Sequence, residues 1–246
     1  MLTQRTGQSD DCPVSFLFGI ANASRMQYNK ANQNGEGWMS MSIITVSREF
    51  GSGGREVGKR LADELGYAYY DREIVTAIAQ KTQLDEGYVA SALDGGMFRG
   101  IPVHFGRTFS YSGTLMANTT KLFVEQHKII RELAERGNCV IVGRAANAIL
   151  EEYHPFNLFV YADMEAKIER CMDRAPEGEQ LSEREMIRHI KKVDADRAKY
   201  YEMFSDTRWG AKEGYHLCVN TTGANIKALV PMIAQYAKNW METNQK

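Results

Sequence analysis

The stretch SIITVSREFGSGGREVGKRLADELG, residues 42–66, decides the fold of this chain. It opens with a short apolar run rich in β-branched residues at 42–47, which predicts a strand buried on both faces. Glycines then cluster over the next few positions, and apolar residues recur at helical spacing until Gly66. The stretch therefore predicts a strand, a glycine-rich bend and a helix.

The glycine-rich bend consists of Gly51, Ser52, Gly53, Gly54 and Arg55. Residues without a Cβ let backbone N–H groups approach an anion closely, and a helix N-terminus adds partial positive charge. We therefore interpret the bend as a loop that holds the phosphates of a nucleotide. The alternative is a plain glycine turn between a strand and a helix.

The bend departs from the common phosphate-loop pattern, G-x-x-x-x-G-K-[ST]. If Gly53 is the last glycine of the pattern, Arg48 stands at its first glycine. Gly54 then stands where the lysine should be, and Arg55 where Ser or Thr should hold magnesium. The backbone cradle survives this change, whereas the lysine and the metal-binding hydroxyl do not. Arg55 and Lys59 lie on one helix face, so either could supply the missing cation.

Composition narrows the class of protein. A chain of 246 residues can form one large α/β domain or one domain with inserts. Its formal net charge of −1 gives no general attraction to nucleic acid or membranes. The cysteines lack paired spacing, which argues against a disulfide framework or zinc site, and no apolar run approaches the ~20 residues that span a bilayer. We expect a cytoplasmic protein, a monomer or small homo-oligomer, that binds neither nucleic acid nor membranes.

The domain organisation follows from shifts in composition. Residues 1–40 are rich in Asn, Gln, Ser and Gly, and we expect them to form a disordered N-terminal extension. Residues 41–246 are expected to form one domain with a core (41–70 and 139–246), a helical insert (71–138) and a short lid (about 174–182). Inserts of this length in a compact domain are usually lids or substrate-binding elements.

A dinucleotide-binding fold is an alternative for the first half of the domain. The short strand YAYYD ends in Asp71, about twenty positions after Gly51, where such a fold keeps a carboxylate for the ribose. However, Glu56 occupies the third glycine position of its fingerprint. The next convincing strand begins only at Cys139, which is too far along the chain for that fold. The spacing therefore excludes this alternative.

Three more strands are predicted: CVIVG from Cys139, FNLFVYA to Ala162 and YHLCVN from Tyr215. The segments between strands show helical periodicity, and Ser182 with Glu185 forms a capping box that starts a long helix. Five strands with interleaved helices predict an α/β fold with a five-stranded parallel sheet.

Several arginines are candidates for contact with substrate anions. Arg144 follows the strand that begins at Cys139, and ligands collect beyond the carboxyl ends of parallel strands. Arg170 and Arg174 lie one turn apart on one helix face. Arg99 and Arg107 lie in the long insert, where a solvated loop arginine is the commoner case.

Charged residues also follow one side of the long helix that begins near Ser182. Lys192, Asp196 and Lys199 lie on the side opposite its apolar stripe. They form either a solvated face joined by salt bridges or a mobile lid whose bases close over phosphates. In the second case Asp196 would accept a hydrogen bond from the substrate. The spacing supports both interpretations equally.

From Ser42 onward the chain resembles the cytidylate kinase-like branch of the nucleoside-monophosphate kinases. The resemblance rests on six blocks in order: ITVSREFGSGGREVGKRLADELG, YYDREI, VIVGRAA, FVYADMEAKIERCMDR, DADRAKYYEMF and YHLCVNTT. It implies a P-loop kinase fold with helices on both faces of the sheet, a monophosphate-binding insert and a lid. It also implies transfer of the γ-phosphoryl group of ATP to CMP or dCMP, with Mg²⁺.

The resemblance assigns roles on the donor and acceptor sides. Gly51 to Arg55 would hold the ATP phosphates, and Asp71 and Arg72 would begin the monophosphate site. Arg144 stands at an arginine that binds the CMP phosphate in typical cytidylate kinases.

The long helix and the lid are assigned in the same way. Asp196 and Lys199 stand at an Asp and an Arg that contact cytidine and phosphate, and Arg170 and Arg174 fall near the lid arginines.

The chain also departs from typical cytidylate kinases. Their loop reads GSGKS where this chain reads GSGGR, and Val142 replaces an aspartate near magnesium. The cytidylate kinase-like branch shares the GSGGRE form, so the resemblance holds, but the metal ligands stay open. Two other hypotheses remain: a P-loop kinase for another small acceptor, and a nucleotide-sensing protein with weak or no catalysis.

Overall fold

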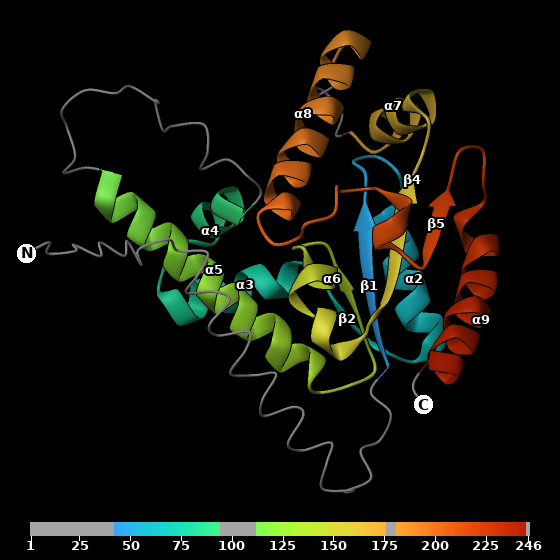
Figure 1. Cartoon of the computed structure of the whole chain (residues 1–246). Coiled ribbons are helices and arrows are strands. Elements are labelled where there is room, and N and C mark those ends of the chain that lie inside the picture. Colours follow the sequence, from blue (N-terminus) through green and yellow to red (C-terminus); the bar gives the residue numbers. More distant parts are fainter. Residues whose placement is uncertain (1–41, 94–111, 176–180, 245–246) are drawn as a thin grey trace, which may run out of the picture. The chain divides into compact units, whose positions relative to one another are not determined.

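The computed structural model describes residues 42–93, 112–175 and 181–244 (Figure 1). All of them belong to the unit Ser40–Lys246. The predicted N-terminal extension, Arg99, Arg107 and most of the predicted lid lie outside the described residues.

Five strands of the described residues form one sheet with the order β2-β3-β1-β4-β5. They are β1 (Ile43–Arg48), β2 (Ala68–Tyr70), β3 (Cys139–Val142), β4 (Phe156–Tyr161) and β5 (Leu217–Asn220). Each pair of neighbours in this sheet runs parallel. The first strand therefore lies at the centre, and the predicted α/β fold with a five-stranded parallel sheet is confirmed.

The α-helices that the structure describes are α2 (Gly54–Leu65), α3 (Arg72–Thr82), α4 (Glu86–Leu93), α5 (Ser112–Ala134), α6 (Ala146–Ile149), α7 (Met164–Asp173), α8 (Glu183–Glu202) and α9 (Ile226–Asn244). Short 3₁₀ turns occur at Glu151–Tyr153 and Lys212–Gly214. None of the described helices is long and apolar enough to cross a bilayer.

Local sequence accounts for the ends of two important helices. Gly53 and Gly66 flank α2 with φ values of 77° and 68°, a left-handed conformation that glycine adopts without steric cost. Helix α8 begins with the predicted capping box, in which Ser182 and Glu185 each accept the other's backbone N–H. The bend and the capping box thus place both helices as the sequence predicted.

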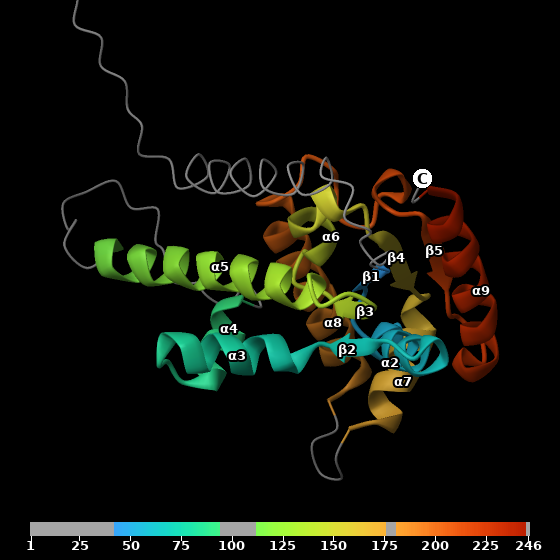
Figure 2. The ribbon, with the colours of Figure 1, turned by 90° about the horizontal axis from the view of Figure 1, so that it is seen from below.

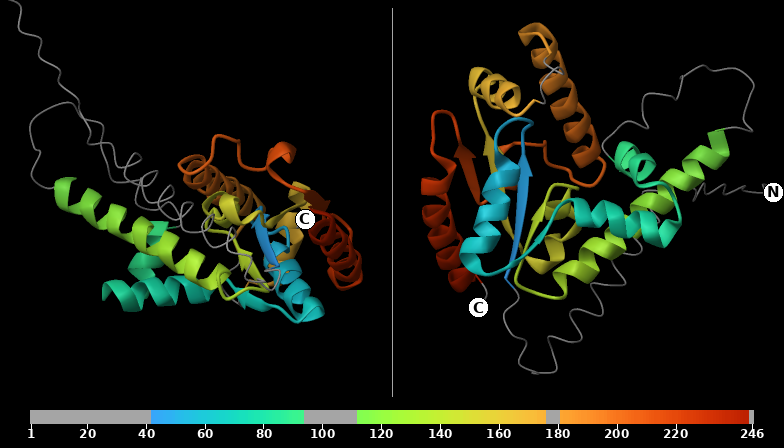
Figure 3. Two further views of the ribbon diagram at one scale, coloured as in Figure 1. Left: turned by 60° about the horizontal axis from the view of Figure 1, so that its bottom comes forward. Right: turned by 180° about the vertical axis from the view of Figure 1, so that it is seen from behind.

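The two faces of the sheet are covered by different helices. Alternate residues of β1, such as Ile44 and Val46, pack with α2 and α9 on one face. Ile43 of β1 and Ile141 of β3 pack with α3, α5 and α6 on the other. Seen from below, α3 and α5 lie to one side of the strands and α9 to the opposite side (Figure 2). The rear view shows α2 lying against β1 (Figure 3).

The carboxyl ends of the central strands lead directly into the site. Helices α7 and α8 stand beyond the ends of β1 and β4 (Figure 1). Helix α2 follows β1, α3 follows β2, and α6 follows β3. Residues from distant parts of the chain therefore converge at this edge of the sheet.

Candidate active site

A cavity of about 680 Å³ opens at the carboxyl edge of the sheet. Its walls come from the ends of β1, β2 and β3 and from α3, α4 and α8. Five arginines line it: Arg48, Arg55, Arg72, Arg144 and Arg197. The lining acids are Asp71, Glu86 and Asp196, and an apolar part is formed by Phe50, Val75, Val193, Tyr200, Tyr201 and Trp209. Basic residues therefore outnumber acidic ones on its surface, which favours an anionic ligand.

Arg48, the last residue of β1, is a largely enclosed arginine of this cavity. Its side chain is 16% exposed, and its guanidinium lies 3.6 Å from a carboxylate oxygen of Asp71. Burial, and next the charge of Arg197, lower the pKa of Arg48 to about 9, although Asp71 opposes this. Asp71 is itself shared, because Arg55 Nε lies 2.5 Å from its other oxygen. Asp71 thus balances the charge of Arg48 only in part, because it also pairs with Arg55.

A turn in an unusual conformation carries Arg144 into the cavity. Gly143, Arg144 and Ala145 have φ values of 78°, 58° and 51° in succession. Non-glycine residues in the left-handed region cost about 1 kcal/mol or more each, and such residues cluster at functional sites. Gln126 on α5 is fully buried, and its side-chain amide donates to the carbonyl of Arg144 (3.3 Å) and to the Tyr200 hydroxyl. Helices α5 and α8 therefore hold this turn in place.

The glycine-rich loop between β1 and α2 is fixed from outside by α7 and by the end of β5. Arg170 of α7 donates to the carbonyl oxygens of Gly51 (2.6 Å) and Thr221 (3.3 Å). The Thr221 hydroxyl donates to the Ser52 carbonyl (2.7 Å). Since these contacts use the carbonyl groups, they leave the amide side of the loop for a ligand.

Four amides of the loop and the first turn of α2 can donate to an anion. Among the described residues, no acceptor receives the N–H groups of Gly51, Gly53, Arg55 or Glu56. They lie at the positive end of the α2 dipole, and Gly51 and Gly53 have the positive φ values typical of anion-binding loops. The loop therefore fits the phosphates of a nucleotide such as ATP.

A buried cluster of charges holds the loop to α7 and α8. Lys167 of α7 is 5% exposed, and its ammonium lies 2.9 Å from Glu49 and 3.3 Å from Asp194. Asp194 of α8 also accepts the backbone N–H of Phe50 (2.7 Å). Sequence reasoning missed this cluster. Lys167 lies on the same helix face as Met164 and Cys171, and a lysine within such a face is the signal that could have revealed it.

The structure brings Arg55, Asp71, Arg72, Arg144 and Asp196 to the wall of one cavity. These predicted residues come from four separate segments of the chain. Their roles stay predictions, but they lie where one small ligand can contact all of them.

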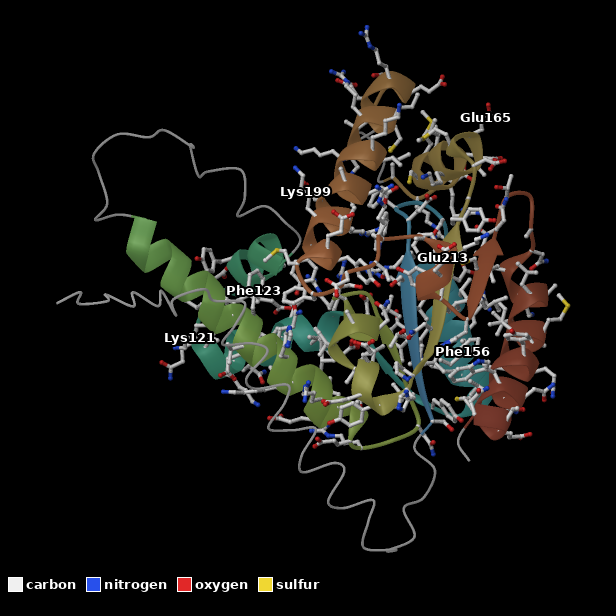
Figure 4. All side chains as sticks on the ribbon, in the orientation of Figure 1. Lys121, Phe123, Phe156, Glu165, Lys199 and Glu213 are labelled. Atoms are coloured by element: carbon white, nitrogen blue, oxygen red, sulfur yellow. The ribbon has the colours of Figure 1, made fainter. Side chains whose placement is uncertain are left out.

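Other predicted residues lie outside the cavity. Lys59 is on the exposed face of α2, where it pairs with Asp63 at 2.9 Å. Arg174 pairs with Glu56 at 2.7 Å, beside the first turn of α2. Lys199 is exposed, on the side of α8 turned toward α4 and α5 (Figure 4). Gly54 is buried beneath the side chain of Arg48.

The part of the chain that the structure describes does not build a metal site by itself. The described residues contain no group of three or more His, Cys, Asp or Glu placed to hold a metal ion. Mg²⁺ in phosphoryl-transfer sites is often held by one or two carboxylates together with substrate phosphates. At this site the phosphates of a bound nucleotide would therefore supply many of its ligands.

A parallel sheet whose first strand leads into a glycine-rich loop and a helix, beside an arginine-lined cavity, is the arrangement expected of a P-loop kinase. Residues 43–223 match the sequence model of the cytidylate kinase-like family. The chain belongs to this family.

Solved structures with similar folds include an uncharacterized protein from Eubacterium ventriosum ATCC 27560, which is 25% identical with a TM-score of 0.58 over 80% of this chain and 98% of that one. A shikimate kinase from Bacteroides thetaiotaomicron is 15% identical, with a TM-score of 0.49 over 80% and 99% of the two chains. A gluconokinase from Sinorhizobium meliloti 1021 is 17% identical, with a TM-score of 0.44 over 84% and 99%. No curated protein gave a significant sequence match.

Proposed function

We propose that the protein transfers the γ-phosphoryl group of ATP to a nucleoside monophosphate, CMP or dCMP, with Mg²⁺. The observation that carries the proposal is the group of arginines around the buried Arg48, next to the phosphate loop. Such a concentration of positive charge favours a strongly anionic ligand. An acceptor that already carries a phosphate supplies that charge, and family membership supports a cytidylate.

On the donor side, the amides of Gly51, Gly53 and Arg55 would hold the phosphates of ATP. The side chain of Arg55 is 56% exposed and can turn from Asp71 toward a bound phosphate. Arg170 positions the loop through the Gly51 carbonyl. Arg174 lies one turn further along α7, beside the same loop.

On the acceptor side, Arg144 and Arg72 would hold the phosphate of the monophosphate. Asp196 lines the same cavity and would accept a hydrogen bond from the base or sugar. Lys199 follows Asp196 by one turn on α8, and it would approach the acceptor from the exposed side.

The chemistry asks these residues for alignment and charge neutralisation. A phosphate oxygen of the acceptor is already a nucleophile, so no side chain has to remove a proton. The arginines would hold two phosphate groups in line, and the cavity walls would exclude water that would otherwise hydrolyse ATP. Mg²⁺ would supply further positive charge at the donor phosphates.

A coupled assay of ATP and Mg²⁺ with CMP, dCMP, UMP, AMP and small hydroxylated metabolites tests the proposal. Turnover with the cytidylates is the expected result. Turnover only with another compound would show that the acceptor is that compound and not a cytidylate. ATP binding without any turnover would favour a nucleotide-sensing protein, and absence of ATP binding would overturn the assignment.

Replacement of Arg144 with alanine tests the acceptor site itself. Loss of an arginine that neutralises and aligns the reacting phosphates typically lowers turnover about 10³-fold or more, so we expect a loss of this size with the circular dichroism spectrum unchanged. Arg188→Ala is the matched control, because Arg188 is an exposed α8 residue outside the cavity. Unchanged turnover in Arg144→Ala would remove Arg144 from the site.

A further inference from the structure

Positions 48 and 54 carry a basic residue and a glycine in the reverse order of the common P-loop pattern. The pattern places glycine at the position of Arg48 and lysine at the position of Gly54. Here the basic side chain, Arg48, comes from the strand before the loop, and the glycine, Gly54, begins the helix after it. The sequence shows the two changes separately, and the structure shows how they are related.

The stem of Arg48 lies directly over Gly54. A Cβ placed on Gly54 would lie 2.4 Å from Cβ and 2.9 Å from Cγ of Arg48. Both distances are well inside van der Waals contact, so no other residue fits at 54 while Arg48 stays in place. Gly54 has no positive φ, so backbone conformation does not demand glycine here. Arg48 therefore fills the space in which a lysine at 54 would begin.

The head of Arg48 reaches the acceptor side of the cavity. A Cβ placed on Gly143 would lie 1.8 Å from Nη1 of Arg48, so the guanidinium passes directly across the start of the turn that carries Arg144. The same guanidinium lies 3.6 Å from Asp71, at the end of β2. One side chain thus extends from the first turn of α2 to the segments that follow β2 and β3.

We propose that Arg48 is the cation that replaces the lysine of the P-loop pattern, and that it contacts the phosphoryl group as it passes from ATP to the acceptor. The inference rests on the proposed phosphoryl transfer. In that reaction the bond between the γ-phosphorus and its bridging oxygen breaks, and a bond to an oxygen of the acceptor forms. Arg48 would donate N–H groups to the oxygens of the transferring group throughout and would give up no proton.

Other basic residues of the loop and helix α2 are placed less well for this role. Lys59 pairs with Asp63 on the outside of α2. Arg55 is 56% exposed, whereas Arg48 is 16% exposed and belongs to the central strand. The backbone of Arg48 is also fixed, because Arg197 donates to its carbonyl oxygen (3.0 Å). An arginine on a fixed backbone can hold two phosphate oxygens at once.

Charge and burial point to the same role. Burial, and next the charge of Arg197, disfavour the protonated form of Arg48; Asp71 opposes this, and Arg144 and Arg55 add to it. An anion between these groups would remove this repulsion. A bound phosphate would therefore stabilise the protonated form of Arg48 more than Asp71 does alone.

The test compares the full-length wild type with three variants. They are Arg48→Met, Gly54→Lys, and a double variant that carries both Arg48→Gly and Gly54→Lys. Methionine keeps the apolar stem over Gly54, so Arg48→Met is expected to fold and to lose about 10³-fold in kcat. Gly54→Lys alone is expected to lose activity as well, because its side chain collides with Arg48. The double variant restores the residue types of the common pattern and is expected to exceed Gly54→Lys at least about tenfold in kcat.

A binding measurement keeps the inference separate from the proposed reaction. Calorimetry with inorganic tripolyphosphate is expected to show about tenfold weaker binding to Arg48→Met than to the wild type. If the wild-type protein turned over no acceptor, the proposed transfer would be wrong. The tripolyphosphate measurement would still decide whether Arg48 binds phosphate. An Arg48→Met protein that keeps its kcat within about threefold, or that binds tripolyphosphate like the wild type, overturns the inference. A double variant no more active than Gly54→Lys overturns the exchange of positions.

Discussion

At the scale of single residues, Arg48 shows how a binding site can cost stability. Its guanidinium is buried at the end of the central strand, near Arg197, Arg144 and Arg55, and Asp71 balances only part of this charge. A buried charge that lacks full compensation is usually unfavourable, and if an apolar residue of similar size replaced Arg48, Asp71 would keep Arg55 as its partner. Sites held ready for a ligand carry this kind of cost.

We therefore predict that Arg48→Met melts at or above the wild-type temperature when no ligand is present. A gain of about 1 kcal/mol would raise Tm by about 2–4 °C in a domain of this size. Phosphate or CMP should raise the Tm of the wild type more than that of the variant, because binding to the variant lacks one charged contact. Differential scanning fluorimetry with and without phosphate measures both effects. A clear drop in Tm without ligand would instead mean that Arg48 is chiefly structural.

The sequence predicted part of this site and missed part of it. Arg144 was placed beyond the carboxyl end of a parallel strand, which the order of elements fixes, and the structure has it in the cavity wall. Arg48 was noticed only as a departure from a pattern. Lys167 and Asp194 were missed. They lie 27 residues apart in the sequence, and local spacing does not show which way a side chain points or which distant residue it pairs with. Strand ends can be predicted from a sequence, whereas buried ion clusters depend on packing.

At the scale of helices and strands, the ends of α2 and α3 are two solutions to one steric requirement. Each helix ends on a residue with left-handed backbone, Gly66 (φ 68°) and Gln83 (φ 57°). Glycine adopts this conformation freely, whereas a residue with a Cβ pays about 1 kcal/mol or more. Both residues are exposed, so packing contributes little to either position.

We predict opposite effects for Gly66→Ala and Gln83→Gly. A Cβ on Gly66 would meet no atom within 4 Å, so Gly66→Ala should lose about 1 kcal/mol through the backbone alone. Gln83→Gly should gain about 0.5–1 kcal/mol, since the relief of strain exceeds the added entropy of the unfolded chain. Urea unfolding of the two variants and the wild type measures both changes. Destabilisation by Gln83→Gly would contradict the steric argument.

At this scale, too, some elements could be predicted from the sequence and others could not. The strand, bend and helix of residues 42–66 were predicted almost to their ends, because apolar spacing and glycine positions are local signals. The capping box of α8 was equally local. Helix α6 (Ala146–Ile149), which is four residues long, was not predicted, since so short an element depends on its contacts with β1 and α5 rather than on its own sequence.

Lys167 joins three elements, and its removal should be costly in a pH-dependent way. Lys167→Met leaves Glu49 and Asp194 without their shared cation, and only Arg197 still pairs with Asp194, at 3.6 Å, so we expect the fold to lose about 3–5 kcal/mol near neutral pH. Burial already raises the pKa of Asp194, and loss of the lysine would raise it further. The folded variant would then bind more protons than the unfolded chain at mildly acidic pH, so its stability falls as the pH rises.

Urea unfolding at pH 5 and pH 8 measures this effect. The deficit of Lys167→Met relative to the wild type should be smaller at pH 5. Lys81→Met is the control, because Lys81 and Glu132 form an exposed pair at 2.8 Å that should contribute less than about 1 kcal/mol at either pH. A deficit of equal size at both pH values would show that Asp194 does not titrate as argued.

At the scale of the whole molecule, α8 contacts both halves of the proposed site. Asp194 accepts the N–H of Phe50 in the phosphate loop, and Arg197 donates to the carbonyl of Arg48. On the same helix, Asp196 and Tyr200 line the cavity proposed for the acceptor. If α8 shifted when the acceptor binds, it would therefore also displace the backbone of the loop that holds the donor.

We predict from this connection that donor and acceptor bind cooperatively. Calorimetric titration of a non-hydrolysable ATP analogue should show about 5- to 150-fold tighter binding when CMP is saturating, the usual range for coupled sites, and the analogue should tighten CMP by the same factor. Asp194→Ala removes the contact with Phe50 N–H and leaves Lys167 paired with Glu49, so its coupling factor should fall toward one while its affinity for CMP alone changes less than about threefold. Glu202→Ala, an exposed change at the end of the same helix, should keep the wild-type coupling. Equal coupling in Asp194→Ala and the wild type would mean that α8 does not transmit the effect through the phosphate loop.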